Sequence, residues 1–237
     1  MAYYNVIDYV TIASAGNASD FGDLNTSDNY RAGTSNGTRG VIGGGSDASA
    51  AANEIDYFTI ASTGNATDFG DLTVARTTYT DSADCNGTRA CFGPGEQDND
   101  MIDYITVAST GNATDFGDMG ATAAAENAGL ESATRACFNA GRTSSSDSSY
   151  QRRIDYVAPA STGNGADFGD MLSGQEGGHT DNGLSNLTRG EWWGGTNSSV
   201  AAMDEIQYIT IASTGNSTDA GNLTEDVRYG PACLSGT

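Results

Sequence analysis

Residues 55–72 read IDYFTIASTGNATDFGDL, and this stretch decides the fold because it returns four more times with few changes. The other copies begin at Ile7, Ile102, Ile154 and Ile206. A second, weaker box follows each of the first four copies and reads SNGTRGVIGGG where it begins at Ser35. A fixed period of about 50 residues is the sequence signature of a repeat architecture.

The first box predicts two strands. Apolar side chains occur on both alternating sets of positions along residues 55–61, which predicts a strand covered on both faces. Gly64-Asn65 predicts a tight hairpin, because both residue types adopt positive φ readily, and residues 67–72 return as a second strand around Phe69. The second box predicts another hairpin about an Asn-Gly turn such as Asn36-Gly37. Each unit therefore predicts four short strands, and no segment shows a sustained helical period.

Four-stranded sheets repeated in series are typical of β-propellers, which have four to eight blades or so. Five copies predict an all-β, five-bladed β-propeller that occupies residues 1–237 as a single domain, with repeats that start near residues 7, 55, 102, 154 and 206. The alternative is a β-helix, but its coils are generally much shorter than this period.

The two chain ends are expected to meet in one blade. Because the chain opens on the third strand of a unit, ring closure should mix N- and C-terminal strands. Residues 232–234 align with a second strand and residues 234–237 with the end of a first strand, and the spacing favours the latter. The closing blade then lacks an interior strand, which residues 2–5, another subunit or residues outside this sequence would supply.

A family resemblance follows from the order of these features. A second box ends in a glycine run (residues 43–45), and the chain then carries Tyr57, a short turn, Phe69 and Arg76 before the next second box begins. This order resembles the kelch repeat, although phenylalanine replaces the usual tryptophan in four copies and Ala220 replaces it in the fifth. The boxes resemble more closely the kelch-like repeats of virion structural and tail-fibre-type proteins in marine tailed bacteriophages. The resemblance implies a propeller, whereas function depends on sites added to such scaffolds.

The two faces of such a disc differ in how much their sequence varies. Turns within hairpins emerge on one face and are nearly uniform, with STGN in four copies and SAGN in the other. Connections between hairpins emerge on the opposite face and vary in length and chemistry; they are residues 25–34, 43–53, 73–84, 93–100, 120–131, 139–152, 172–184 and 194–204. Variation over a fixed scaffold is typical of recognition surfaces. The alternative is that these loops merely tolerate change.

The pattern predicts a non-enzymatic adhesion module, and the resemblance places it on an extracellular virion, with the variable face contacting a host-surface glycan or protein. One alternative is a purely architectural virion protein whose partners are other virion proteins and which binds no ligand. A propeller-type glycan hydrolase is a distant third. Oligomerisation is expected if the closing blade is completed by another subunit.

Four residues are candidates for ligand binding. Trp192 and Trp193 are the only tryptophans, and one of them occupies a position that is glycine in other copies, where an exposed ring could stack on a sugar. Simple packing is the favoured interpretation of both rings. Arg142 and His179 lie in variable connections, and His179 is the only histidine. A solvated loop position suits His179 better than the role of a catalytic base.

Three residue types recur as structural positions of the repeat. They are tyrosines at Tyr9, Tyr57, Tyr104, Tyr156 and Tyr208, phenylalanines at Phe21, Phe69, Phe116 and Phe168, and arginines at Arg39, Arg89, Arg135 and Arg189. The planar fork of arginine suits bidentate contacts with carboxylates, so these arginines are expected to pair with the recurring aspartates. A ring of arginines that binds an anion in a central channel is the alternative.

The recurring carboxylates are interpreted as turn and edge devices, because a catalytic pair needs to occur only once. Asp56, Asp68 and Asp71 illustrate the three positions. Their density permits weak Ca²⁺ binding through oxygen ligands, but no EF-hand-type loop is present and no other cofactor is expected. No cluster of histidine and cysteine offers a transition-metal site. Cys91 and Cys137 occupy equivalent strand positions and are expected to be small buried side chains.

Composition excludes some partners. The chain of 237 residues has 31 acidic and 10 basic residues, with a formal net charge of −21, and every base is arginine. Nucleic-acid binding and adsorption to anionic membranes both need clustered positive charge, so neither is expected. No apolar run of 18 residues and no signal-peptide pattern occurs.

Overall fold

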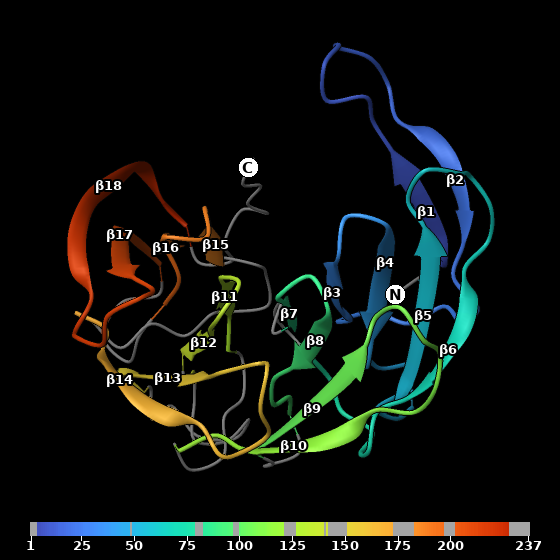
Figure 1. The fold of residues 1–237 in the computed structure, drawn as a ribbon. Coiled ribbons are helices and arrows are strands. Elements are labelled where there is room, and N and C mark those ends of the chain that lie inside the picture. Colours follow the sequence, from blue (N-terminus) through green and yellow to red (C-terminus); the bar gives the residue numbers. More distant parts are fainter. Residues whose placement is uncertain are drawn as a thin grey trace.

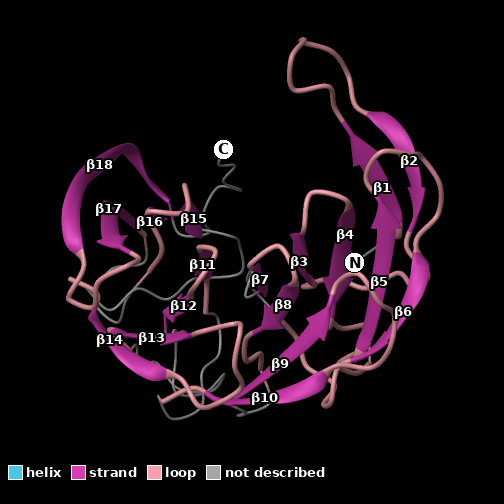
Figure 2. Ribbon diagram, viewed as in Figure 1, coloured by secondary structure: helices cyan, strands magenta, loops and turns pink. Residues whose placement is uncertain are grey.

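The computed structural model describes residues 4–47, 49–78, 83–96, 100–120, 127–139, 141, 151–172, 183–196 and 202–227. Within these ranges the chain forms strands, turns and bends but no helix, as Figure 2 shows. The expectation of an all-β chain is therefore confirmed for the described residues. None of them belongs to a helix that is long and apolar enough to cross a membrane.

The strands form five antiparallel sheets in chain order. Sheet 1 has two described strands, β1 (Val6–Tyr9) and β2 (Ser19–Asp23). The other four have four strands each. Sheet 2 contains β3 (Ala32–Ser35), β4 (Arg39–Gly43), β5 (Glu54–Thr59) and β6 (Thr67–Asp71). Sheet 3 contains β7 (Ala83–Cys85), β8 (Arg89–Phe92), β9 (Met101–Thr106) and β10 (Thr114–Asp118).

The last two sheets repeat this plan. Sheet 4 contains β11 (Gly129–Glu131), β12 (Ala136–Asn139), β13 (Arg153–Val157) and β14 (Ala166–Asp170). Sheet 5 contains β15 (Gly183–Ser185), β16 (Arg189–Trp193), β17 (Met203–Thr210) and β18 (Thr218–Val227). The four strands expected in each unit are thus present in sheets 2–5.

The sheets follow one another around an arc, which gives the molecule a β-propeller-like architecture (Figure 1). The first strands of neighbouring sheets lie against each other near the middle, since β3 contacts β7, β7 contacts β11 and β11 contacts β15. The fourth strands, such as β6 and β10, lie on the outside. In the described residues the arc stays open between sheet 5 and sheet 1.

The Asn-Gly turns of the second boxes form as the sequence predicts. Gly37 has a φ of 80°, a region that favours glycine. The Asn36 side-chain oxygen accepts hydrogen bonds from the Thr38 and Arg39 amides at 3.0 and 2.9 Å. This asparagine-centred turn joins β3 to β4 over only three residues, so it fixes their register. The equivalent asparagines Asn86 and Asn186 accept the same pair of bonds.

The prediction of a tight hairpin turn at Gly64-Asn65 is wrong. Residues 60–66 separate β5 from β6, and the chain bends earlier, where the Ser62 amide donates to the Thr59 carbonyl at 3.2 Å. Gly64 then lies against sheet 1 and not within a two-residue turn, because its amide donates to the Phe21 carbonyl at 2.7 Å. The glycine thus serves contact between sheets.

The hydrophobic core lies between successive sheets. Between sheets 2 and 3, Val41, Ile55 and Phe69 pack against Ala90 and Phe92. Two further clusters repeat this arrangement between sheets 3 and 4 and between sheets 4 and 5. Sheets 3 and 4 therefore bury their two faces against different neighbours, as the apolar groups on both faces of the strands predict. Cys91 and Cys137 are fully buried in these clusters, which confirms their expected role as small buried side chains.

Candidate functional site

The uniform turns bind the preceding sheet. The Gly64 and Ala66 amides donate to the Phe21 and Asp23 carbonyls, each at 2.7 Å, and the Asn65 side-chain oxygen accepts the Asp23 amide at 3.2 Å. The same three bonds join sheets 2 to 3, 3 to 4 and 4 to 5. The STGN sequence is therefore uniform because it forms the outer junction between sheets.

Glycine in the Asp-Phe-Gly-Asp strand makes this approach possible. A β-carbon on Gly22, whose φ is 151°, would lie 2.3 Å from the Gly64 carbonyl oxygen. Gly70, Gly117 and Gly169 face the next turn in the same way. Gly221 on β18 also has positive φ, but a β-carbon there would meet no atom within 4 Å. The last strand thus carries a junction surface that no described residue covers.

The recurring tyrosines and phenylalanines, which the sequence assigns to the scaffold, form ring pairs within the sheets. Tyr57 and Phe69 form an edge-to-face pair with ring centroids 5.8 Å apart. Equivalent pairs occur in sheets 1, 3 and 4, with Tyr9–Phe21, Tyr104–Phe116 and Tyr156–Phe168. Edge-to-face geometry is favourable for aromatic rings beyond the area they bury. In sheet 5, Ala220 stands at the phenylalanine position, so Tyr208 lacks this ring pair.

The recurring arginines do not pair with the recurring aspartates, so that expectation is wrong. Arg39 lies over the Tyr57 ring, 4.6 Å from its centroid, and donates from Nη1 to the Val107 carbonyl of the next sheet at 2.9 Å. Arg89 and Arg135 make the same two contacts, Arg89 with Tyr104 and Pro159, and Arg135 with Tyr156 and Ile211. The ring face attracts the cation, and the carbonyl engages its planar fork. These guanidinium groups therefore join sheets.

Arg189 differs because it starts the second strand of the last sheet. Its guanidinium carbon lies 3.6 Å from the Tyr208 ring centroid, and its Nε lies 2.9 Å from the Glu191 carboxylate. Glu191 occupies the position held by the fully buried Val41, Cys91 and Cys137 in other sheets. The outward face of sheet 5 is therefore more polar than its counterparts.

The third-strand aspartates of sheets 2, 3 and 4 are buried and paired, which corrects their interpretation as edge devices, whereas Asp8 of sheet 1 is exposed. Asp103 and Arg76 form an ion pair at 2.6 Å with both side chains fully buried. Burial lowers the pKa of Arg76, and the Asp103 carboxylate opposes that shift. Asp56 pairs with Arg31 at 3.0 Å, and Asp155 with Arg153 at 2.8 Å. Removing one partner of such a pair would leave an uncompensated buried charge.

Sequence comparison of the repeats misses these partners because their spacing is irregular. The arginine precedes its aspartate by 25 residues at Asp56, by 27 at Asp103 and by 2 at Asp155. The informative signal is in sheet 5, where Gln207 replaces the aspartate. Gln207 is neutral and accepts hydrogen bonds from the Leu172 amide at 2.7 Å and the Ser217 hydroxyl at 2.6 Å.

The predicted ligand-binding residues do not form one site. Trp192 is fully buried between sheets 4 and 5, which confirms packing for this ring. Trp193 is half-buried, and its indole N–H donates to the Glu191 carboxylate at 3.0 Å. Arg142 and His179 lie outside the described residues, so their grouping with the tryptophans stays a prediction.

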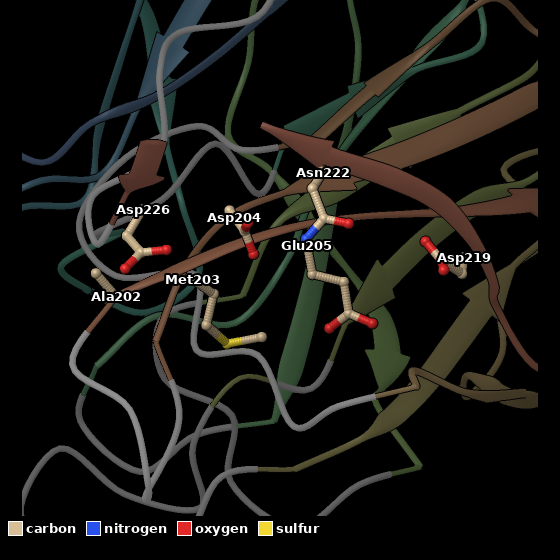
Figure 3. A pocket seen from close by; sticks show the side chains of 7 residues that line it. All are labelled: Ala202, Met203, Asp204, Glu205, Asp219, Asn222 and Asp226. Atoms are coloured by element: carbon tan, nitrogen blue, oxygen red, sulfur yellow. The ribbon is translucent and has the colours of Figure 1, made fainter. Parts of the chain in front are cut away.

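An acidic pocket of about 360 Å³ lies beside the strands β17 and β18 (Figure 3). Its lining residues are Ala202, Met203, Asp204, Glu205, Asp219, Asn222 and Asp226. Within the described ranges, no group of three or more histidine, cysteine or acidic side chains has the geometry to hold a metal ion. Weak Ca²⁺ binding therefore stays a prediction without a defined site.

A second pocket, of about 450 Å³, lies between sheets 1 and 2, and we call it the β1 groove. Its lining residues are Ile7, Asp8, Tyr9, Val10, Phe21, Phe58, Ile60, Ala61, Ser62 and Thr63. Tyr9 is 45 % exposed, and Val10 is 58 % exposed. Such exposure of large apolar side chains on a strand edge marks an unfilled interface.

These features define a β-propeller-like repeat protein whose repeated residues join its sheets. The sequence matches no protein-family model, and no curated protein matches it.

Proposed function

We propose that the chain is a non-enzymatic binding module on a closed five-bladed kelch-like propeller, carried on a phage virion. Loops on the variable face contact a glycan or protein of the host surface. The observation that carries this proposal is that the uniform turns and the variable connections have different tasks. The uniform turns bind the neighbouring sheet through backbone atoms, so a partner is recognised by the opposite, variable connections.

One variable connection shows how such a loop keeps its shape. The exposed Asp47 carboxylate accepts hydrogen bonds from the Ser49 amide, the Ser49 hydroxyl and the Ala50 amide at 2.7 to 2.8 Å. These bonds, led by that from the Ser49 amide, lower the pKa of Asp47. Asn29 and Ser46 exchange backbone bonds at 3.1 and 2.9 Å. A loop ordered by its own contacts can change sequence without disturbing the sheets, and it offers a preorganised surface.

Ring closure is supported by complementary unused surfaces at the two open ends. Among the described residues, the Gly16 turn makes no backbone hydrogen bond to another sheet, and a β-carbon on Gly221 of β18 would meet no atom within 4 Å. At the other junctions these same two elements bind each other. Closure would place the Gly16 amide on the Ala220 carbonyl, and the Arg189 guanidinium near the Ile12 carbonyl.

A disulfide test distinguishes a closed ring from an open arc. Asn17 and Asn222 correspond to Asn65 and Asp23, which are hydrogen-bonded at 3.2 Å. In a Cys233→Ser background, the pair Asn17→Cys and Asn222→Cys should oxidise to an intramolecular disulfide, as the control pair Asp23→Cys and Asn65→Cys should. Intermolecular cross-links, or none, from the first pair alone would contradict closure within one chain.

Binding by the variable face is tested by loop replacement. The labelled chain is measured on an array of bacterial surface polysaccharides and on intact marine bacteria. Replacing residues 46–51 with a Gly/Ser segment of equal length, and the other variable connections in turn, should abolish binding in at least one variant without shifting the thermal unfolding midpoint. The control Ser62→Ala on the turn face should bind normally. Unchanged binding by every loop variant would overturn the proposal.

A purely architectural role in the virion is a second candidate, and the free edge of β1 favours it. Unpaired strand edges are templates for pairing with another chain. Stoichiometric incorporation into particles by a chain that binds no glycan or cell would support this role over adhesion.

A further inference from the structure

The free edge of β1 is the one place where the described repeat lacks a strand next to its third strand. In sheet 2, β4 pairs with β5 in a register that sets Arg39 opposite Thr59 and Val41 opposite Tyr57. In sheets 3, 4 and 5 the second strand pairs with the third in the same way. In sheet 1 the described partner of β1 is β2 alone.

The β1 groove has the contacts that a second strand uses elsewhere. A strand in the register of β4 would place its arginine opposite Thr11 and over the Tyr9 ring. The carbonyl equivalent to that of Val107 belongs to Ile60, which lines the groove. Ile7, Phe21 and Phe58 supply apolar lining. The groove thus presents a ring face, a backbone acceptor and an apolar floor in the order that engages Arg39 between sheets 2 and 3.

Charge at the groove also favours a cationic side chain. Asp8 is exposed on β1 and lines the groove, and it pairs in register with Asp20 on β2. The whole chain carries a formal net charge of −21. An arginine that enters the groove therefore meets a negative surface as well as the Tyr9 ring.

The described residues hold no spare strand of this type. The strands β4, β8, β12 and β16 are each paired within their own sheets. Asn5 exchanges hydrogen bonds with Leu24 at 2.6 and 3.1 Å, so it continues the pairing with β2 and does not lie on the free edge. Tyr4 is 74 % exposed. The sequence of residues 228–237, RYGPACLSGT, has no Thr-Arg pair followed by apolar residues.

We propose that the β1 groove binds, in trans, an extended segment of the Thr-Arg type from a second polypeptide. The segment adds to β1 as an antiparallel strand, and its backbone supplies affinity as in other strand-addition complexes. Its arginine lies over Tyr9 and donates to the Ile60 carbonyl, and its following apolar residues cover the exposed β1 edge. The partner is therefore a protein that presents an unpaired hairpin like residues 34–44. This inference does not depend on what the variable face binds.

A peptide from this chain provides the probe. Fluorescein-labelled TSNGTRGVIGG, the sequence of residues 34–44, is titrated with the full chain and followed by fluorescence polarisation. Saturable binding is expected. The Arg39→Ala peptide and the Tyr9→Ala protein should each bind about tenfold more weakly, because each loses the contact between cation and ring. Tyr4→Ala, an exposed change on the same end of the chain, should bind normally.

A cross-link tests the register without removing a contact residue. Gly40 stands opposite Phe58 in sheet 2, and Val10 is the equivalent of Phe58. A Gly40→Cys peptide should form a disulfide with Val10→Cys protein and not with Val6→Cys protein. Absence of saturable binding, an affinity unchanged in both Arg39→Ala peptide and Tyr9→Ala protein, or cross-linking to Val6→Cys would overturn the proposal. Binding only by a chain shortened to residues 1–227 would overturn it too, because the groove would then be filled in cis.

Discussion

Strands β1 and β5 have nearly the same sequence, IDYVTI and IDYFTI over residues 7–12 and 55–60, but they are buried differently. Ile55 is fully buried in the cluster between sheets 2 and 3. Tyr9 and Val10 are exposed on sheet 1, and Ile12 is 92 % exposed, whereas its counterpart Ile60 is 41 % exposed and the equivalent Val107 of sheet 3 is fully buried. The difference teaches that a unit of this repeat does not bury its own apolar residues. Its neighbours in the arc do so.

The largest effect should come from removing the aromatic ring of a complete junction. Phe69 is 2 % exposed and packs between sheets 2 and 3. Phe69→Ala should lower the free energy of unfolding by about 3–5 kcal/mol, through lost burial and the cavity that remains. Phe21→Ala, in the incomplete sheet 1, should cost clearly less. Urea unfolding followed by circular dichroism measures both, and equal costs would mean that sheet 1 is as well packed as sheet 2.

The glycine junction gives the next largest effect. Gly70→Ala should destabilise the chain by about 1–3 kcal/mol through overpacking, because the new β-carbon would lie 2.6 Å from the carbonyl group of Gly111. Both Gly70 and Gly221 have positive φ, so both alanine variants are strained in the backbone. In the closed ring that we propose, the Gly16 turn also covers Gly221, so Gly221→Ala should cost about as much. The two thermal unfolding midpoints are compared, and a clearly smaller shift for Gly221→Ala would indicate an open arc.

Arginines that begin second strands test the same junctions. Arg89→Met loses the Tyr104 ring and a hydrogen bond to the Pro159 carbonyl, so it should cost about 2 kcal/mol. Arg189→Met loses the Tyr208 ring, and in the closed ring that we propose it also loses a hydrogen bond to the Ile12 carbonyl, so it should cost a similar amount. Chemical denaturation of the two variants is the measurement. A cost below about 1 kcal/mol at Arg189 would indicate an open arc, in which only the ring and the partly exposed Glu191 pair are lost.

Exchanging a thiol has the smallest effect on stability, but its alkylation reports directly whether that one position is covered. Burial raises the pKa of Cys91 to about 12, so its reactive thiolate is scarce in the folded chain at pH 8. Glu191→Cys places a thiol at the equivalent, partly exposed position of sheet 5. Iodoacetamide should alkylate Glu191→Cys in the native state, whereas Cys91 should react only in urea. Protection of the introduced thiol would mean that sheet 5 has a covering neighbour.

The sign of the pH dependence follows from the same shift. A thiol whose pKa is raised by folding stabilises the folded state fully below its unfolded value, and that contribution is lost as pH rises from about 9 towards 12. Cys91→Val should therefore reduce the loss of stability over that interval. The comparison of urea midpoints at pH 8 and pH 10 checks it.

Much of the fold could be predicted from the sequence, because strand alternation and the Asn-Gly turn are local signals. The four strands of each complete unit and the Asn36 turn depend only on residues close in sequence. The sequence mispredicts the Gly64-Asn65 turn because its geometry is imposed by Phe21 and Asp23, which precede their bonding partners Gly64 and Asn65 by 43 and 42 residues. A Gly-Asn pair is compatible with a tight turn, but it is equally compatible with contacts to a sheet that lies far away in the sequence.

The candidate site was less accessible to sequence reasoning. The recurrence of Arg39 and its equivalents is visible in the repeats, but their partners are a ring and a backbone carbonyl, and a carbonyl carries no sequence signal. The pairing of Arg76 with Asp103 could not be predicted, because their separation in the sequence is not shared by the other copies. The β1 groove exists because no described strand lies on the free edge of β1. Only the structure reveals which side chains are left uncovered there.

The contact of Gly64 with Phe21 has a further consequence for how a gene of this kind changes. The contact uses backbone atoms and a repeated glycine, so each unit presents the same turn to the unit before it and the same outer strand to the unit after it. Unequal recombination that adds or deletes one whole unit would leave every remaining turn beside a matching outer strand. We therefore expect unit number in such genes to change in single steps, whereas point mutations accumulate in those parts of the connections that contact no neighbouring sheet.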